Sequence, residues 1–338
     1  MAAWIEVKNE IVNRNYDYDG VRREKIKAVE IITNRPLVIY STAFLEGPKV
    51  EASRGEVQID RMDSIGFNEV INRITGKELD VLIHSPGGSP EAAEAIVDLL
   101  RSKFDHIRFI VPHMAKSAAT MICCSGNEIL MDEKSELGPI DPQMQLLRSD
   151  GKITVAPAQA IIKQFDKAKL SLANNPKEMT AWLPILQPLG PSLLTECEIA
   201  NQLSKLLVTK WLINYMFSGM ENINELAEKI ADFLANNDIH MSHGRRINID
   251  QVKEIGMVVS DLRDNEPLRI AVWNLYHAIS WTLQETPAFK IIENGQGDAF
   301  IRQVFVSQIP IPPQIPRINP PSKQPTQAQN SRKSRKRH

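Results

Sequence analysis

Residues 79–132 read LDVLIHSPGGSPEAAEAIVDLLRSKFDHIRFIVPHMAKSAATMICCSGNEILMD. The stretch begins with a short apolar run that ends in Pro-Gly-Gly, as is typical of a buried parallel strand. Ser89 and Pro90 then provide an N-cap and a first-turn proline for a helix. The sequence predicts strands at 79–85, 106–113 and 128–132, with helices between them at 90–104 and 115–126. This alternation predicts right-handed parallel crossovers and an α/β core.

The flanking segments extend this core. Residues 1–30 are predicted to be helical and to rest on the domain. A β-rich run covers 35–44, and helical spacing covers 64–76. Beyond residue 150 the chain is predicted to be mainly helical, with a last long helix at 266–284. Residues 288–294 and 299–306 are expected to pair as a hairpin.

The composition is that of a soluble globular protein. Hydrophobic residues make up 43%, charged residues 24%, and the net charge is −1. This balance gives no general attraction to nucleic acid. We predict an N-terminal helical segment (1–30), one domain (31–308) and a disordered Pro-rich and basic tail (309–338). The tail is interpreted as solubilising, with contact to anionic lipid or nucleic acid as the alternative.

Three cysteines are too few for a disulfide framework or a zinc site. Cys123 and Cys124 are adjacent, Cys197 is distant, and no CxxC pair occurs. We interpret all three as buried thiols in a reducing compartment and expect a cytoplasmic location. The N-terminus has no basic start followed by an apolar core, so it does not resemble a secretory signal.

The Gly87-Gly88 pair follows a predicted strand, where ligands bind in open α/β folds. Two glycines allow backbone amides to approach a substrate closely and to hold the negative charge that develops during acyl transfer. A tight turn without function is the plain alternative. A phosphate-binding loop is disfavoured, because no Gly-Lys-Ser/Thr follows.

Ser117 lies at the start of the next predicted helix, in the small-residue run AKSAAT. The helix N-terminus there favours an oxyanion, and the amide of Ala118 is a candidate second donor. A serine chosen for its small size is the alternative. No G-x-S-x-G elbow is present, which disfavours an α/β-hydrolase. Because Ser117 and the Gly-Gly turn follow successive strands, they are expected to face one bound carbonyl.

Three segments, LDVLIHSPGGSPEAAEAIVDLLRSKF, IRFIVPHMAKSAATMI and ELGPIDPQM, resemble the serine dehydrogenase proteinase family of Clp-fold serine proteases. That family is related to signal peptide peptidase A and the Clp proteolytic subunit, and the resemblance extends over about residues 30–306. It implies a Clp-protease/crotonase-like fold of repeated β-α units with additional C-terminal helices. It also implies that Ser117 is the nucleophile and that Gly87 and Gly88 form the oxyanion hole.

The sequence departs from the Clp pattern at the general base. A histidine follows the Clp nucleophile by about two dozen residues, whereas this chain reads LGPIDPQ there. The signal peptide peptidase A relatives use a lysine, and Lys169 lies at a similar sequence distance. His243 is the rival base, beside the position of the Clp triad aspartate. Asp141 is a candidate to orient the base or to cap a turn.

The sequence therefore predicts a serine peptidase that needs no metal, nucleotide or other cofactor. Its expected partners are a peptide or protein substrate and further copies of itself, without specific nucleic acid; peripheral membrane contact is left open. Two alternatives remain: an inactive scaffold that binds peptides or partner proteins, and a crotonase-like acyl-thioester enzyme that would not need Ser117.

Overall fold

A mixed seven-stranded sheet forms the centre of the chain in the computed structural model, which describes residues 4–147, 151–187 and 189–304. The strand order is β11-β10-β1-β2-β3-β5-β9. The parallel strands are β1 (Leu37–Thr42), β2 (Glu78–His84), β3 (His106–Val111), β5 (Glu128–Met131) and β9 (Val259–Asp261). β10 (Ala288–Asn294) and β11 (Ala299–Gln303) add an antiparallel edge. The α/β prediction is confirmed, and β9 was not foreseen.

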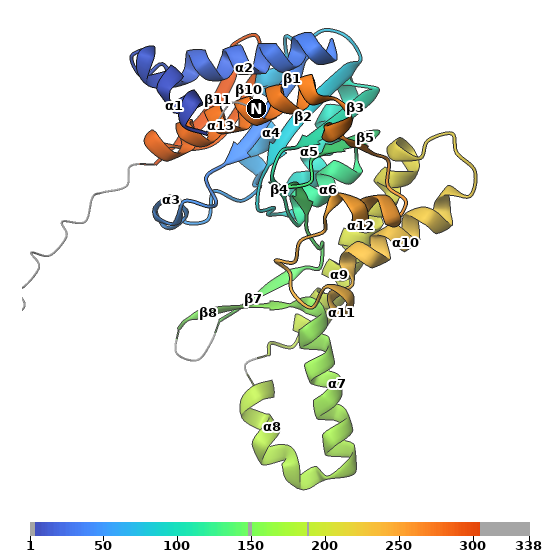
Figure 1. Cartoon of the computed structure of the whole chain (residues 1–338). Coiled ribbons are helices and arrows are strands. Elements are labelled where there is room, and N and C mark those ends of the chain that lie inside the picture. Colours follow the sequence, from blue (N-terminus) through green and yellow to red (C-terminus); the bar gives the residue numbers. More distant parts are fainter. Residues whose placement is uncertain (1–3, 148–150, 188, 305–338) are drawn as a thin grey trace, which may run out of the picture. The chain divides into compact units, whose positions relative to one another are not determined.

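Helices cover both faces of this sheet (Figure 1). The helices are α1 (Trp4–Asn13), α2 (Tyr18–Thr33), α3 (Gly47–Ala52), α4 (Arg61–Ile71), α5 (Pro90–Lys103), α6 (Ala118–Cys124), α7 (Ala158–Asn174), α8 (Met179–Leu186), α9 (Leu193–Trp211), α10 (Ile223–Ala235), α11 (Asn237–His240), α12 (Ile249–Glu254) and α13 (Glu266–Glu285). A π-helical turn, η2 (Leu212–Met216), continues α9.

Alternate residues of the strands supply two separate cores, as expected for a sheet covered on both faces. Val38 and Tyr40 of β1 belong to the core that contains α4, α5, α6, α9 and α10. Leu37 and Ile39 belong to the other core, which contains α2 and α13. Helix α1 packs on α13 through Val7 and Ile11, so the N-terminal helices rest on the domain as predicted.

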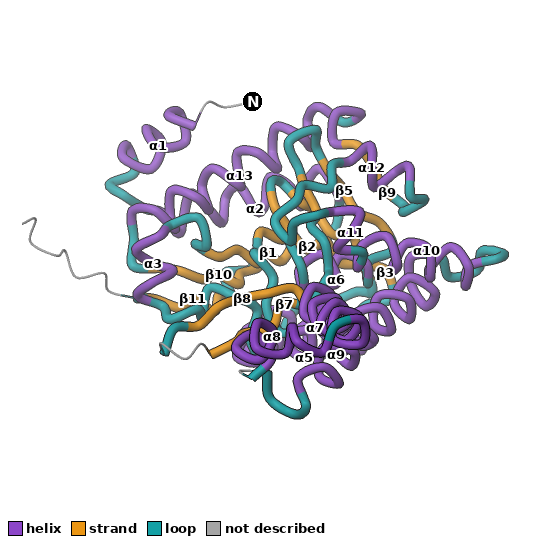
Figure 2. Tube along the Cα trace, turned by 90° about the horizontal axis from the view of Figure 1, so that it is seen from below, coloured by secondary structure: helices purple, strands orange, loops and turns teal. Residues whose placement is uncertain are grey.

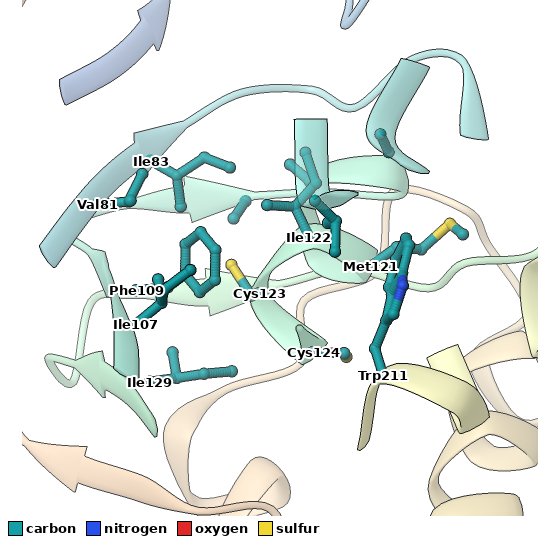
Figure 3. Close-up of a cluster of buried hydrophobic side chains, with 14 of the residues drawn as sticks. Val81, Ile83, Ile107, Phe109, Met121, Ile122, Cys123, Cys124, Ile129 and Trp211 are labelled. Carbon is teal, nitrogen blue, oxygen red and sulfur yellow. The ribbon is translucent and has the colours of Figure 1, made fainter. Parts of the chain in front are cut away.

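Helix α6 is anchored deep in the first core. Met121, Ile122, Cys123 and Cys124 are all buried and pack among residues of β2, β3, β5 and α9, including Trp211 (Figure 3). The helix is shorter than the predicted 115–126, because Met114–Ala115 form strand β4 and pair with β6 (Glu136–Leu137). The tight packing of α6 fixes the position of the residue that precedes it, Ser117.

A hairpin outside the main sheet was not predicted. Strands β7 (Gln143–Leu147) and β8 (Ile153–Pro157) pair antiparallel and lead into α7 and α8. Figure 2 shows α7 and α9 beside this hairpin, and α8 is tied to α7 by a hydrogen bond from Trp182 Nε1 to Ser171 Oγ (2.8 Å). The prediction of a mainly helical chain beyond residue 150 is confirmed by α7 to α13, and strand β8 is an addition to it.

The remaining predictions divide into those tested and those outside the described residues. The three thiols are buried and unpaired, as predicted. None of the described helices combines the length and apolar character needed to cross a bilayer. The tail predicted at 309–338, and the end of the strand predicted at 299–306, lie outside the described residues.

Candidate active site

Ser117 occupies a sharp turn between β4 and α6. Its backbone angles are φ 51° and ψ −122°, which non-glycine residues rarely adopt. Such a conformation costs about 1–3 kcal/mol and persists only where the surrounding structure enforces it. Although Ser117 is at the N-cap position of α6, its hydroxyl makes no capping hydrogen bond. The strained, uncapped serine fits a reactive group better than a helix cap.

The Gly87-Gly88 turn lies directly against Ser117. A Cβ atom on Gly87 would lie 2.6 Å from the Lys116 carbonyl oxygen and 2.7 Å from the Ser117 Cβ. The two turns are joined by backbone hydrogen bonds from Ser85 N to Met114 O and from Lys116 N to Ser85 O, both 3.0 Å. Gly87 and Gly88 have φ values of +94° and +157°. The structure thus brings together the two motifs that the sequence placed on successive strands.

Two backbone amides at this junction are available to a ligand. Among the described residues, no protein group accepts a hydrogen bond from the N–H of Gly88 or of Ala118. Gly88 borders the same cavity as Ser117, and Ala118 follows Ser117 directly. Paired amide donors beside a serine hydroxyl can stabilise the oxyanion of a tetrahedral intermediate.

His243 and Asp141 form a hydrogen-bonded pair, with 2.8 Å between Nδ1 and Oδ1. The Asp141 side chain is 1% exposed and that of His243 is 28% exposed. The other Asp141 oxygen accepts hydrogen bonds from Gln143 Nε2 (2.9 Å) and Asn237 Nδ2 (3.1 Å). These three donors fix the carboxylate as an acceptor, so in the neutral imidazole of His243 Nδ1 carries the proton and Nε2 is the acceptor.

Two contacts bring these distant segments to Ser117. Leu137 and Ile247 exchange backbone hydrogen bonds of 3.0 and 3.1 Å, which hold the Asp141 loop beside the His243 loop. Thr120 Oγ1 donates to Ala115 O (2.7 Å) and accepts from Gly138 N (3.0 Å), which ties the Asp141 loop to the Ser117 turn. The role of Thr120 was not predicted, because its place in the AKSAAT run was the one local signal it offered.

Ser117, Gly88 and His243 line one cavity of about 640 Å³. Its apolar walls come from several elements, with Met121, Ile140, Met144, Val155, Ile199 and Leu203 among them. Gln143, beside Asp141, also lines it. A cavity that combines apolar walls with convergent polar groups is typical of a ligand site.

Lys169, the alternative base, is elsewhere. It is exposed on α7 and does not line the cavity that contains Ser117. Lys116 is beside Ser117 in sequence, but its ammonium group pairs with Glu136 (2.7 Å) and contacts Leu137 O (3.2 Å). Of the residues predicted to act as base or to orient it, the structure brings His243 to the cavity and Asp141 to His243, whereas Lys169 lies elsewhere.

Two further histidines flank the motifs but belong to an aromatic cluster. His84 stacks on His113, with 5.6 Å between ring centroids, and His113 Nδ1 lies 2.9 Å from the Tyr276 hydroxyl. Burial, with His113 as the second cause, lowers the pKa of His84 to about 3. A histidine that stays neutral in this cluster is a packing residue.

The cysteines do not offer an alternative nucleophile. Burial raises the pKa of Cys124 to about 12 and that of Cys123 well above its ordinary value. Both thiols therefore stay protonated and lie inside the core. Within the described residues, no group of three or more His, Cys, Asp or Glu side chains is placed to hold a metal ion.

Comparisons with known proteins agree with the predicted family. Residues 61–182 match the family described as ClpP-like SDH-type serine proteinase. The uncharacterized protein MJ0137 of Methanocaldococcus jannaschii is 29% identical over 54% of this chain and 54% of its own length. MJ1495 of the same organism is 36% identical over 21% of this chain and 25% of its own. The chain thus spans about half or less of the curated relatives that it matches.

Solved structures of one protease are also similar. Two variants of the membrane-bound stomatin-specific protease 1510-N, one of them in complex with a substrate peptide, have TM-scores of 0.37 and sequence identities of 17% and 18%. The matches cover 62% of this chain and 78% and 74% of those chains.

Proposed function

We propose that this chain, whose residues 61–182 belong to the ClpP-like SDH-type serine proteinase family, is a serine peptidase with Ser117, His243 and Asp141 as its catalytic triad. The observation that carries the proposal is the pairing of His243 with a buried Asp141 at the border of the cavity that holds Ser117. This is the arrangement of nucleophile, base and orienting carboxylate that activates a serine hydroxyl.

The roles follow from the positions of the groups. Nε2 of His243 takes the proton of Ser117 as Oγ attacks the peptide carbonyl, and Asp141 stabilises the imidazolium that results. The amides of Gly88 and Ala118 hold the oxyanion. The imidazolium then protonates the leaving amine, and water hydrolyses the acyl-enzyme with His243 again as base.

The chain order of this triad differs from that of the Clp subunit. The acid now follows the nucleophile by about two dozen residues, where Clp has its histidine, and the histidine stands beside the Clp aspartate position. An exchange of base and acid between two loops is compatible with one mechanism, because a triad is defined by geometry and not by sequence order. This exchange removes the need for a lysine base, and Lys169 is left out of the proposal.

The substrate is proposed to be a peptide with apolar side chains near the cleaved bond. Met121, Ile140 and Leu203 give the cavity apolar walls, and Gln143 and Gln145 add amide groups for backbone contacts. Apolar side chains buried against such walls contribute roughly 1.5–3 kcal/mol each.

Self-association belongs to the same proposal. Leu170, Leu183 and Leu206, on α7, α8 and α9, are 66%, 52% and 64% exposed. These exposed apolar side chains on α7, α8 and α9 are the reason for proposing contact with a second copy. Light scattering on the purified chain and on Leu183→Asp/Leu206→Asp tests this: a smaller mass for the variant supports the interface, and an unchanged mass contradicts it.

Cleavage of a quenched-fluorescent peptide library, with apolar residues varied at each position, tests the peptidase proposal. Wild type is expected to cleave, and Ser117→Ala is expected to bind the same peptides without cleaving them. Binding without cleavage by both proteins would favour a scaffold. Turnover of acyl-CoA that survives Ser117→Ala would favour an acyl-thioester enzyme.

A further inference from the structure

Behind the Gly-Gly turn, on the side of Ile59, lies a fully buried group of charges. Lys290 of β10 and Asp63 of α4 have 0% exposed side chains, and the Lys290 ammonium group lies 2.7 and 2.9 Å from the two Asp63 oxygens. Burying such a pair is costly, and it is kept only where its geometry is well satisfied. Neither residue lines the cavity, so the triad proposed above makes no use of them.

This pair clamps the short segment Gln58–Asp60 from both ends. Lys290 Nζ donates to the carbonyl of Gln58 (2.7 Å), and the amide of Asp60 donates to Asp63 Oδ2 (3.0 Å). Asp60 is also held by Arg302 Nη1 (2.6 Å). The peptide groups on either side of Ile59 are therefore fixed by buried charges.

Ile59 in turn fixes the Gly-Gly turn. Its amide donates to Gly87 O (2.8 Å), and its carbonyl accepts from Ser89 N (3.0 Å). The approach is so close that a Cβ on Gly88 would lie 2.3 Å from Ile59 O. In a trans peptide the C=O and N–H point in opposite directions. Because the Gly87 carbonyl points to Ile59, the Gly88 N–H points away from it, on the side of the turn that borders the cavity.

A second route reaches the same turn. The Tyr40 hydroxyl, also fully buried, donates to Asp63 Oδ2 (2.8 Å). The Ser85 side chain lies near the Tyr40 phenol, and Ser85 Oγ accepts a hydrogen bond from Gly87 N (3.2 Å). Burial raises the pKa of Tyr40 well above its ordinary value, so the phenol keeps its proton for Asp63. Asp63 thus supports both Ile59 and Ser85.

We infer that Lys290, Asp63 and Tyr40 are positioning residues that aim the Gly88 amide at the reacting carbonyl. This inference rests on the proposed function for its catalytic meaning, but its structural part stands on the contacts of the turn alone. Ser85 and Ile59 transmit the effect, and none of the three positioning residues touches the substrate. A misplaced donor would weaken binding of the tetrahedral intermediate and leave ground-state peptide binding unchanged.

The test compares Lys290→Met and Tyr40→Phe with Arg22→Met. Arg22 is a matched control, because it also has a 0% exposed side chain and pairs with a 0% exposed carboxylate, Glu293, but makes no contact with segments 58–60 or 85–89 among those described. Two quantities are measured on each folded variant: the rate of fluorophosphonate labelling relative to peptide affinity, and amide hydrogen exchange in 87–89.

Lys290→Met is expected to slow labelling by about 10²-fold, at unchanged peptide affinity, and to speed exchange in 87–89. Tyr40→Phe, the milder change, is expected to shift both in the same direction. Labelling and exchange like those of Arg22→Met would overturn the inference. If wild type does not label at all, the proposed function fails, and the exchange comparison alone decides whether the charges hold the turn. Should Lys290→Met not fold, Tyr40→Phe decides it.

Discussion

His243 donates a hydrogen bond of 2.8 Å from Nδ1 to Asp141 Oδ1, although 102 residues separate the two in the chain. The bond selects the tautomer of the neutral imidazole in which Nε2 is the acceptor, and His243 borders the cavity that Ser117 also lines.

Replacing His243 should separate the two candidate bases. His243→Ala is expected to lower kcat by at least about 10³-fold, because the serine loses its proton acceptor. Lys169→Ala, the matched change at the other candidate, should leave kcat within about twofold of wild type, since Lys169 is exposed and outside the cavity. Steady-state cleavage of one peptide measures both, and the reverse pattern would assign the base to Lys169.

Asp141→Asn should affect catalysis more than binding. The amide can donate to Nδ1, which favours the wrong tautomer; the same change in other serine proteases costs about 10⁴-fold in kcat. KM is expected to change little, because the carboxylate is buried behind His243. An equal loss in Asn237→Ala, which removes only one of the hydrogen bonds to Asp141 and lies outside the cavity, would contradict this role.

Gly88→Ala should remove activity through backbone displacement. The added Cβ would meet Ile59 O at 2.3 Å and Ile59 N at 2.4 Å, so the turn must shift and the amide donor with it. A loss of about 10²-fold or more in kcat is expected, as for loss of one oxyanion donor. Gly47→Ala is the control, since nothing lies within 4 Å of its Cβ position. Activity of Gly88→Ala equal to that control would exclude the turn from the oxyanion hole.

Stability should fall as the pH drops below about 6.5. The pKa of His84 is about 3 in the folded chain, against about 6.5 when unfolded, so between these values the unfolded state binds more protons. Folding stability from this residue is present above the unfolded pKa and is lost as the pH falls toward 3. Urea unfolding at pH 7.5 and pH 5 measures the change. His84→Leu should show a shallower pH dependence, and an unchanged one would contradict this cause.

The strands and helices of residues 79–132 could be predicted from the sequence, because their apolar runs and their Ser-Pro and Pro-Gly-Gly boundaries are local signals. The proximity of Ser117 to the Gly-Gly turn could also be predicted, because successive parallel strands end at the same edge of the sheet. Hairpin β7–β8 was not predicted, although Asp150-Gly151 is a hairpin signal, because the sequence that follows it has helical spacing.

The hydrogen-bonded pairing of His243 with Asp141 could not be predicted from the sequence. It depends on the bridge between Leu137 and Ile247, which joins two loops far apart in the chain. Asp141 in a Gly-Pro-Ile-Asp-Pro loop looks like a turn residue, and His243 like an exposed loop histidine. The buried group of Tyr40, Asp63 and Lys290 could not be predicted either, because its members come from three separate elements, β1, α4 and β10.

Intact-mass analysis after exposure to a fluorophosphonate tests whether Ser117 is the nucleophile. One adduct is expected on wild type, mapped to Ser117 by peptide sequencing, with no adduct on Ser117→Ala and slow labelling of His243→Ala. Equal labelling of wild type and Ser117→Ala, or no labelling of the folded wild-type chain, would contradict it.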